Sequence, residues 1–247
     1  MAVWIEVNNV TKSFPVGFWM RAREVIHQAS FALEENRSVG FVGPNGSGKT
    51  TLMKLMLNFI FPDSGEIRYP SCDNNFSIFR SQLGFMPERP FLYDFLSARE
   101  FLYFHWVLGG GTGSFKKRMD EILKKVRLSG EENTRLRHFS KGMLQRIGLG
   151  QALLHRPKYL ILDEPMSGLD PDGRYEMRVI LKEQKDAGST ILLSSHLIED
   201  VEYICDDVLL IMEGRIVYFG AISDLKKNMQ EDDLYSIISR LKVGGRK

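Results

Sequence analysis

A glycine-rich stretch, GPNGSGKTT, begins at Gly43 and constrains both the fold and the chemistry of the chain. It fits the pattern G-x-x-x-x-G-K-[ST], in which glycines let backbone N–H groups turn toward phosphate oxygens. The stretch follows SVGFV at 38–42, a short β-branched and aromatic run typical of a buried strand. An apolar helical pattern follows at 50–61. A strand, a glycine loop and a helix in this order predict a phosphate-binding loop in an α/β fold.

The side chains of this loop match the chemistry of a nucleotide site. We expect Lys49 to reach the β- and γ-phosphates and the Thr50 hydroxyl to bind Mg²⁺. An accidental glycine turn is the alternative, and the flanking strand and helix argue against it. The residues expected to bind the nucleotide here are Gly43, Pro44, Asn45, Gly46, Ser47, Gly48, Lys49, Thr50 and Thr51.

A second run, YLILDEP from Tyr159, has the apolar-then-acidic pattern of a buried parallel strand that ends at a ligand site. Ligands of open α/β sheets lie beyond the carboxyl ends of the strands. We therefore expect Asp163 to lie beside Mg²⁺ and Glu164 to act as general base toward the attacking water. A strand that merely ends in a charged turn is the alternative, and the phosphate loop upstream makes it less favoured.

These motifs resemble those of the nucleotide-binding subunit of an ABC transporter, over nearly all of residues 2–222. FSKGMLQR at 139–146 is similar to the signature motif of that family, here with Ser140 and Gly142 in their usual places. Lys141 stands where the family has a glycine, and Met143 where it has a glutamine. The resemblance implies ATP and Mg²⁺ as ligands.

Further residues take roles that only the resemblance implies. His196, after the apolar strand TILLSS, resembles the switch histidine that contacts the γ-phosphate. Phe14 resembles the aromatic residue that stacks on adenine. Glu88 occupies a position where the family commonly has a glutamine that touches Mg²⁺ or the attacking water. A glutamate can still ligate a hard cation, so we expect Glu88 to serve as a metal residue.

The signature motif also has a role that follows from helix physics. Ser140 precedes an amphipathic pattern, GMLQRIGLGQALLH, so it should cap that helix, whose free N–H groups attract an anion. The resemblance implies that this anion is the γ-phosphate held by a second subunit. It therefore implies a head-to-tail dimer or pseudo-dimer closed around two ATP molecules.

The composition and the cysteine pattern favour a cytoplasmic protein and argue against nucleic acid as a partner. A formal net charge of +2 gives no strong field for nucleic acid. We find no signal peptide and no uncharged apolar run long enough to span a bilayer. Cys72 and Cys205 form no C-x-x-C pair and are expected to be reduced thiols. We expect a cytoplasmic protein, peripheral on the cytoplasmic face of the cell membrane, whose membrane half is another polypeptide.

The expected architecture is a single P-loop NTPase domain of the ABC ATPase type. A mostly parallel core sheet and an antiparallel β subdomain would occupy 1–88 and 152–222. An inserted helical subdomain would span 89–151, and a short helical tail would follow at 223–247.

Two aromatic segments are candidate partner surfaces. We expect Glu88 to Phe95 to line the groove for a transmembrane permease subunit, although aromatic stripes are more often packed inward. Near the N-terminus, Phe18, Trp19 and Met20 lie beside arginines. They fit an ordinary hairpin loop or, less often, a contact with a membrane surface or a partner.

The leading hypothesis is the ATP-hydrolysing subunit of an ABC exporter, with Glu164, His196 and Lys49 as catalytic residues. Alternatives are the ATPase of an ABC importer, or a soluble assembly ATPase of the same type that is not involved in transport.

Overall fold

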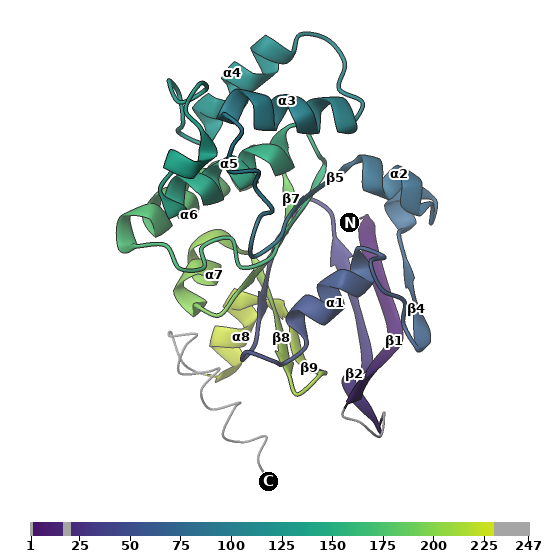
Figure 1. Ribbon diagram of the computed structural model, residues 1–247. Coiled ribbons are helices and arrows are strands. Elements are labelled where there is room, and N and C mark those ends of the chain that lie inside the picture. Colours follow the sequence, from purple (N-terminus) through teal and green to yellow (C-terminus); the bar gives the residue numbers. More distant parts are fainter. Residues whose placement is uncertain (1, 17–20, 230–247) are drawn as a thin grey trace. The chain divides into compact units, whose positions relative to one another are not determined.

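The computed structural model describes residues 2–16 and 21–229 (Figure 1). The chain divides into two compact units, residues 1–79 with 192–247 and residues 80–191, here called the first and the second unit. Each is described by itself. Phe18, Trp19, Met20 and most of the predicted C-terminal tail lie outside the described residues.

The first unit contains an antiparallel sheet formed by β1 (Val3–Val16), β2 (Arg21–Glu34) and β4 (Ser64–Arg68), in the order β2-β1-β4. This sheet is the antiparallel part of the predicted fold. Trp4, Ile5 and Val7 on β1 are fully buried, as are Ile26 and Leu33 on β2. A short 3₁₀ helix (Pro70–Cys72) and α2 (Phe76–Ser81) follow β4.

The same unit holds the strand that leads into the phosphate loop. β3 (Ser38–Val42) is buried along its whole length and pairs in parallel with β8 (Asp207–Met212), which pairs antiparallel with β9 (Arg215–Ala221). Helix α7 (Ile198–Ile204) packs closely on β3, because a Cβ at Gly40 would collide with Val201. β9 leads into α8 (Ile222–Met229).

Helix α1 (Lys49–Met56) starts inside the glycine loop, as predicted, but it is shorter than the pattern at 50–61 suggested. The chain leaves the helix because Asn58 adopts the left-handed backbone region, with φ of 55°, and its N–H bonds to the Leu55 carbonyl. Asparagine is one of the few residues that tolerate this conformation.

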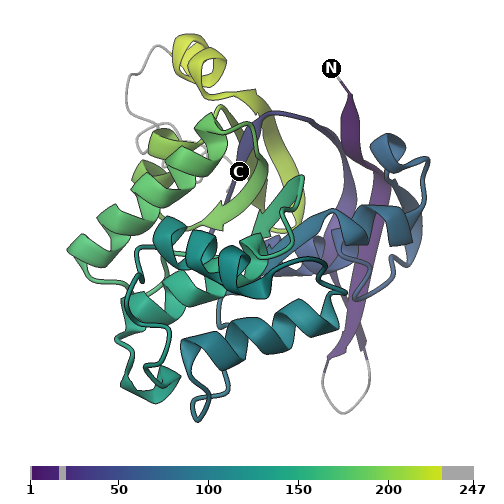
Figure 2. The same cartoon turned by 90° about the horizontal axis from the view of Figure 1, so that it is seen from above.

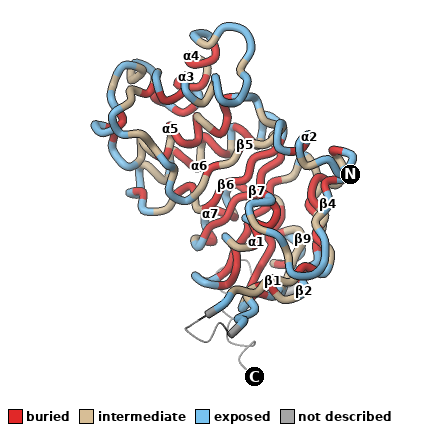
Figure 3. Tube along the Cα trace, turned by 45° about the vertical axis from the view of Figure 1, so that its right-hand side comes forward, coloured by how far each residue is buried: buried red, intermediate tan, exposed pale blue. Residues whose placement is uncertain are grey.

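The second unit pairs two short parallel strands, β5 (Leu83–Met86) and β6 (Tyr159–Leu162). Helix α5 (Lys141–Leu153) lies close on β5, since a Cβ at Gly84 would collide with the Ala152 carbonyl oxygen. β7 (Thr190–Ser195) runs across the boundary of the units. Figure 3 shows β6 and β7 in red, because every residue of these two strands is buried.

Helices make up the rest of the second unit: α3 (Ala98–Leu108), α4 (Phe115–Lys125), a 3₁₀ turn (Leu136–His138) and α6 (Pro171–Asp186). α3 and α4, drawn in teal, lie side by side (Figures 1 and 2). The guanidinium of Arg118 on α4 is buried and donates to the carbonyls of Leu153 (2.5 Å) and Leu154 (2.8 Å), so it fastens α4 to the end of α5. GGGTG at 109–113 forms the loop between α3 and α4.

Candidate functional site

The phosphate loop joins β3 directly to α1. The structure gives a different reason for glycine at Gly43 than at Gly46 and Gly48. A Cβ at Gly43 would collide with the Ile211 carbonyl and lie 2.6 Å from Ser47 Oγ. Gly46 and Gly48 take φ of +78° and +108°, which side chains disfavour. The N–H of Gly214, in the turn after β8, donates to the Ser47 carbonyl at 3.0 Å. This hydrogen bond connects the phosphate loop to the turn between β8 and β9.

Lys49 lies with its amine inside the curve of this loop. Its side chain is buried, and Nζ donates to the carbonyls of Gly43 (2.7 Å) and Pro44 (3.3 Å). Ser47 Oγ is buried and has no partner among the described residues. The first turn of α1 carries no acidic residue. A fixed cation, an unpaired hydroxyl and free helix N–H groups fit a bound phosphate.

Beside the loop lies a cavity of about 530 Å³ lined by Pro44 to Ser47, by Arg23 to Val25 and His27 on β2, and by the turn at Glu213 and Gly214. Phe14, the expected adenine-stacking residue, lies on β1 as the register partner of Arg23. The Lys12 amine stands 5.7 Å from the centre of its ring. The first unit thus places Phe14 one strand away from the lining of the cavity.

Three predicted residues of the second unit follow the ends of its parallel strands. Asp163 comes directly after β6, is buried, and its backbone N–H donates to the Met86 carbonyl at the end of β5 (2.8 Å). Glu88 comes two residues after β5 and is exposed. Glu164 adopts φ of +47°. For a non-glycine residue this conformation costs free energy, and such strain gathers at functional positions.

The signature motif opens α5 as expected. Ser140 is the N-cap, and its Oγ accepts from the Met143 N–H at 3.2 Å. The first turn of α5 contains no acid, so its positive end is not neutralised from within the helix. A Cβ at Gly142 would meet nothing closer than Ser140 Oγ at 3.9 Å. The fold of the second unit therefore leaves room for a side chain at Gly142.

His196 directly follows β7 and belongs to the first unit. It is exposed, while its neighbour Ser195 is buried and bonds through Oγ with the Leu197 N–H (3.0 Å) and the Asp200 carboxylate (3.3 Å). These two bonds fix the turn that presents the histidine. Thr50 and Thr51 lie in the first turn of α1 after Lys49.

No group of three or more His, Cys, Asp or Glu side chains is gathered as a metal site in the part of the chain that the structure describes. Mg²⁺ does not require such a group, because it keeps several waters and binds through one or two carboxylates together with the phosphates of a substrate.

Sequence reasoning missed Gln145. Its side chain is 5% exposed, Nε2 donates to the Glu88 carbonyl at 3.3 Å, and Oε1 is buried without a partner among the described residues. The only available signal was its position one helical turn after Lys141. A polar residue at that position is equally typical of a solvent-facing helix surface, so the pattern could not identify it.

Comparisons with known proteins decide the family. The family model described as "ABC transporter" matches residues 26–167, more than half of the chain. The chain belongs to the ABC transporter family. It is an ATPase cassette of that family with the α/β P-loop fold, which confirms the predicted resemblance and fold class. Among the described residues, no helix combines the length and the apolar character needed to cross a membrane.

Individual relatives support this assignment. The chain is 38% identical to an uncharacterised ABC transporter ATP-binding protein of Nostoc over 90% of its own length and 67% of that protein. It is 31% identical to the linearmycin resistance ATP-binding protein LnrL of Bacillus subtilis over 94% and 74%. A solved ATP-binding subunit of an ABC transporter superposes with a TM-score of 0.81 at 27% identity, covering 97% of this chain and 99% of that one.

Proposed function

We propose that this ABC cassette hydrolyses ATP to ADP and phosphate and that the hydrolysis energises transport, in the direction of export, through a separate transmembrane partner. The observation that carries the proposal is the phosphate loop. Its lysine amine donates to the Gly43 carbonyl at 2.7 Å, and the same loop carries a buried hydroxyl on Ser47 that has no partner among the described residues. A triphosphate is the ligand whose charge and oxygen acceptors this arrangement matches.

Each candidate residue has a role in this reaction. Lys49 and the loop N–H groups bind the β- and γ-phosphates, and Phe14 stacks on the base. Glu164 takes a proton from water as the water oxygen bonds to the γ-phosphorus. The bond from that phosphorus to the β–γ bridging oxygen breaks, and ADP leaves with the bridging oxygen. His196 stabilises the charge that develops on the γ-phosphoryl oxygens.

Mg²⁺ would be held by Thr50, Asp163 and Glu88, together with phosphate oxygens and water. Bound there, the ion would neutralise charge on the β- and γ-phosphates. The chain's own contribution is to supply one hydroxyl and two carboxylates as oxygen ligands. Ser140 and Gly142, at the positive end of α5, would bind the γ-phosphate of a nucleotide carried by a second subunit.

Export is supported by the name of one relative, since LnrL is a resistance protein, and by Glu88 in place of the usual glutamine. The segment Glu88 to Phe95 is the surface we propose for the transmembrane partner. Phe91 and Phe95 are 81% and 62% exposed, whereas Phe101 on α3 is fully buried. Contiguous exposed aromatic surface of this kind marks interaction sites.

Lysine substitutions test the proposed hydrolysis. Lys49→Ala removes the cation that stabilises the transferred phosphoryl group, and we expect phosphate release to fall by about 10²-fold or more. Lys54→Ala is the matched control, because Lys54 lies on the same helix and is exposed. Its rate of phosphate release should equal that of the wild type. Equal rates for both variants would contradict the proposed role of the loop.

A further inference from the structure

Helix α5 contacts the segment that follows β5 along one of its faces. A Cβ at Gly148 would lie 2.9 Å from Pro90 Cγ, so the helix and the segment touch there without space for a side chain. One turn earlier, Gln145 Nε2 donates to the Glu88 carbonyl at 3.3 Å. Side chains three residues apart are neighbours on a helix. The segment from Glu88 to Pro90 is therefore held at two successive positions of the same helix face.

The amide of Gln145 makes the polar contact on this face. Its side chain is 5% exposed, and Nε2 is the donor because the partner atom is a carbonyl oxygen. Oε1 of the same amide is buried and has no partner among the described residues. A buried acceptor without a partner disfavours folding, and an apolar side chain of the same length would avoid that cost. Stability therefore does not explain a glutamine here, whereas the bond to Glu88 does.

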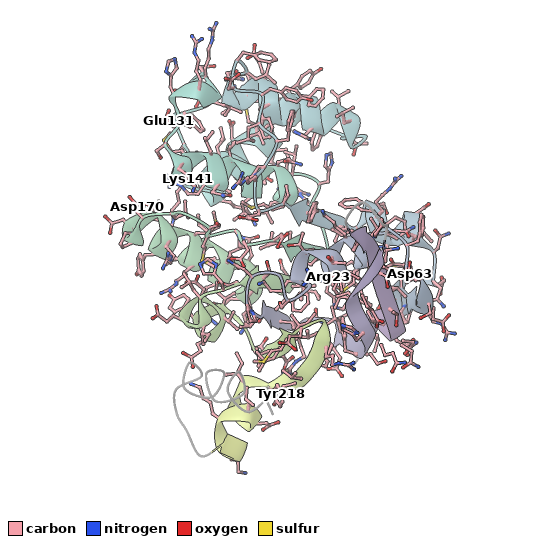
Figure 4. The ribbon with its side chains drawn as sticks, turned by 60° about the horizontal axis from the view of Figure 1, so that its bottom comes forward. Arg23, Asp63, Glu131, Lys141, Asp170 and Tyr218 are labelled. Carbon is pink, nitrogen blue, oxygen red and sulfur yellow. The ribbon has the colours of Figure 1, made fainter. Side chains whose placement is uncertain are left out.

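The hydrogen bond joins two segments that have separate roles in the proposed function. Lys141, labelled in Figure 4, is the first residue of α5, and Gln145 follows it by one turn. The start of α5 is the site proposed for the γ-phosphate of a second subunit. Glu88 is a proposed Mg²⁺ ligand, and the exposed Phe91 follows it in the surface proposed for the transmembrane partner.

The backbone sets the position of the Glu88 side chain. Glu88 and Gln145 line the same cavity, of about 330 Å³. Within the part of the chain that the structure describes, the Glu88 carboxylate makes no hydrogen bond or ion pair. Two residues earlier, the Met86 carbonyl accepts from the Asp163 N–H at 2.8 Å. The backbone of this segment is thus held first beside Asp163 and then by Gln145, and the carboxylate follows the backbone.

We infer that Gln145 is a positioning residue: by holding the Glu88 carbonyl on α5, it sets where the Glu88 carboxylate stands relative to Asp163. The inference rests on the proposed function, in which both carboxylates help to hold Mg²⁺. Loss of the hydrogen bond frees the backbone after β5, so the carboxylate spreads over more positions and fewer of them suit the ion. Mg²⁺ is then held more weakly, although the fold is kept.

The mobility of the segment tests the anchor in the protein without nucleotide. A nitroxide attached at Arg89→Cys lies next to the anchored residue, and Cys72 and Cys205 are buried, so the label reacts at the introduced thiol. Gln145→Met keeps the length of the side chain but removes the donor. We expect its electron paramagnetic resonance spectrum to give a rotational correlation time shorter by about twofold or more. An unchanged spectrum would overturn the inference.

Gln151→Met is the matched control. Gln151 lies on the same helix, and its side chain makes no hydrogen bond within the described residues, so the spectrum should equal that of the wild type. Chemical unfolding separates positioning from a structural role. Because Gln145→Met also removes the unpaired Oε1, its unfolding equilibrium constant should stay within about threefold of the wild type. A much larger change would show that Gln145 serves the fold, and would overturn the inference.

Hydrolysis measured against Mg²⁺ concentration tests the consequence at the site. Gln145→Met should raise the half-saturating Mg²⁺ concentration by about threefold or more. In a Glu88→Ala background the same substitution should shift it by less than about 1.5-fold, because no carboxylate is left to position. An equal shift in both backgrounds, or no shift in either, would overturn the inference.

The two proposals fail separately. A wild-type protein that hydrolyses no ATP would refute the proposed function. The nitroxide spectra would still decide whether Gln145 anchors the segment after β5, since they are recorded without nucleotide or Mg²⁺.

Discussion

Two glycines of the candidate site differ in how closely the fold packs around them. At Gly43 the fold leaves no room, because a Cβ would meet the Ile211 carbonyl, which belongs to the backbone and cannot turn aside. At Gly142 the fold leaves space on all sides. A sequence motif shows both as glycines, and only the coordinates separate a requirement of folding from a requirement of binding.

Substitution by alanine should therefore act in opposite directions on stability. Gly43→Ala should lower the free energy of unfolding by about 1–3 kcal/mol through overpacking. Gly142→Ala should raise it by about 0.5–1 kcal/mol, because alanine loses less backbone freedom than glycine when the first turn of α5 forms. Denaturant titration of the two variants measures both effects. If Gly142→Ala also lowers the rate of ATP hydrolysis, the absence of a side chain at Gly142 serves the approach of a ligand. A lower free energy of unfolding for Gly142→Ala would contradict the open space around this position.

The conformation of Glu164 could not have been predicted from its residue type. Glutamate has no special preference for the left-handed region, and nothing in YLILDEP signals a φ of +47°. The order of the motifs was enough to predict roles for Asp163 and Glu164. The strained backbone of Glu164, in contrast, is a property of the packed turn after β6.

At the scale of elements, periodicity and capping predicted most of what is observed. SVGFV is β3, TILLSS is β7, and Ser140 caps α5, as predicted. The structure also shows Ser97 as the cap of α3. The predicted end of α1, at residue 61, was wrong by five residues, because the helix ends at Met56. Asn58, within the apolar run, adopts the left-handed backbone conformation that stops it. Phe91 and Phe95 are exposed, as a surface over Glu88 to Phe95 requires, whereas Phe101 on α3 is buried. A helical stripe does not by itself reveal which face meets the core.

The two capping serines form a natural pair for comparison. Ser97 and Ser140 each accept a backbone N–H three residues later, at 3.2 Å in both cases. Substitution of either by alanine should lower stability by about 1 kcal/mol. Only Ser140→Ala should also slow phosphate release, because we propose that the N-terminus of α5 binds a γ-phosphate. Equal rates of hydrolysis in the two variants would show that Ser140 is only a cap.

The aromatic segment before α3 gives a prediction about partners. Phe91→Asp places a charge on an 81% exposed ring position, so folding and nucleotide binding should be unaffected while the transmembrane partner is lost. Co-purification of tagged protein from detergent-solubilised native membranes, with partners identified by mass spectrometry, measures this. Tyr175→Asp on α6, at 62% exposure, is the control. Loss of ATP binding in Phe91→Asp would identify the segment as core, and soluble partners alone would contradict transport.

At the scale of the whole molecule, the second unit is inserted into the first, with crossings at Phe79 and Leu192. The helical insertion predicted over 89–151 lies within the second unit, which runs from 80 to 191 and also includes β5, β6 and α6. Periodicity identifies where helices lie. It does not show which strands fold together with them, because strand pairing joins residues far apart in the chain.

Dimerisation is the prediction that involves the complete chain. Glu164→Gln cannot accept the proton from water, so ATP should persist and hold two copies together through their signature motifs. Light scattering in excess ATP should report a mass close to twice that of the monomer. Adding Ser140→Ala to this variant should reduce the dimer fraction. A monomer at high protein concentration would show that the isolated subunit does not associate in this way.

The parallel pairing of β3 with β8 has a consequence for biosynthesis. Val39 pairs with Asp207, so 168 residues separate the two partners, and the whole of the second unit is made between them. At roughly 5–20 residues per second, a ribosome needs about 8–34 s to supply the partner strand. During that interval the apolar strand SVGFV has no β8 to cover it, so a nascent chain of this protein should depend on chaperones that shield its first 80 residues until the return crossing has emerged.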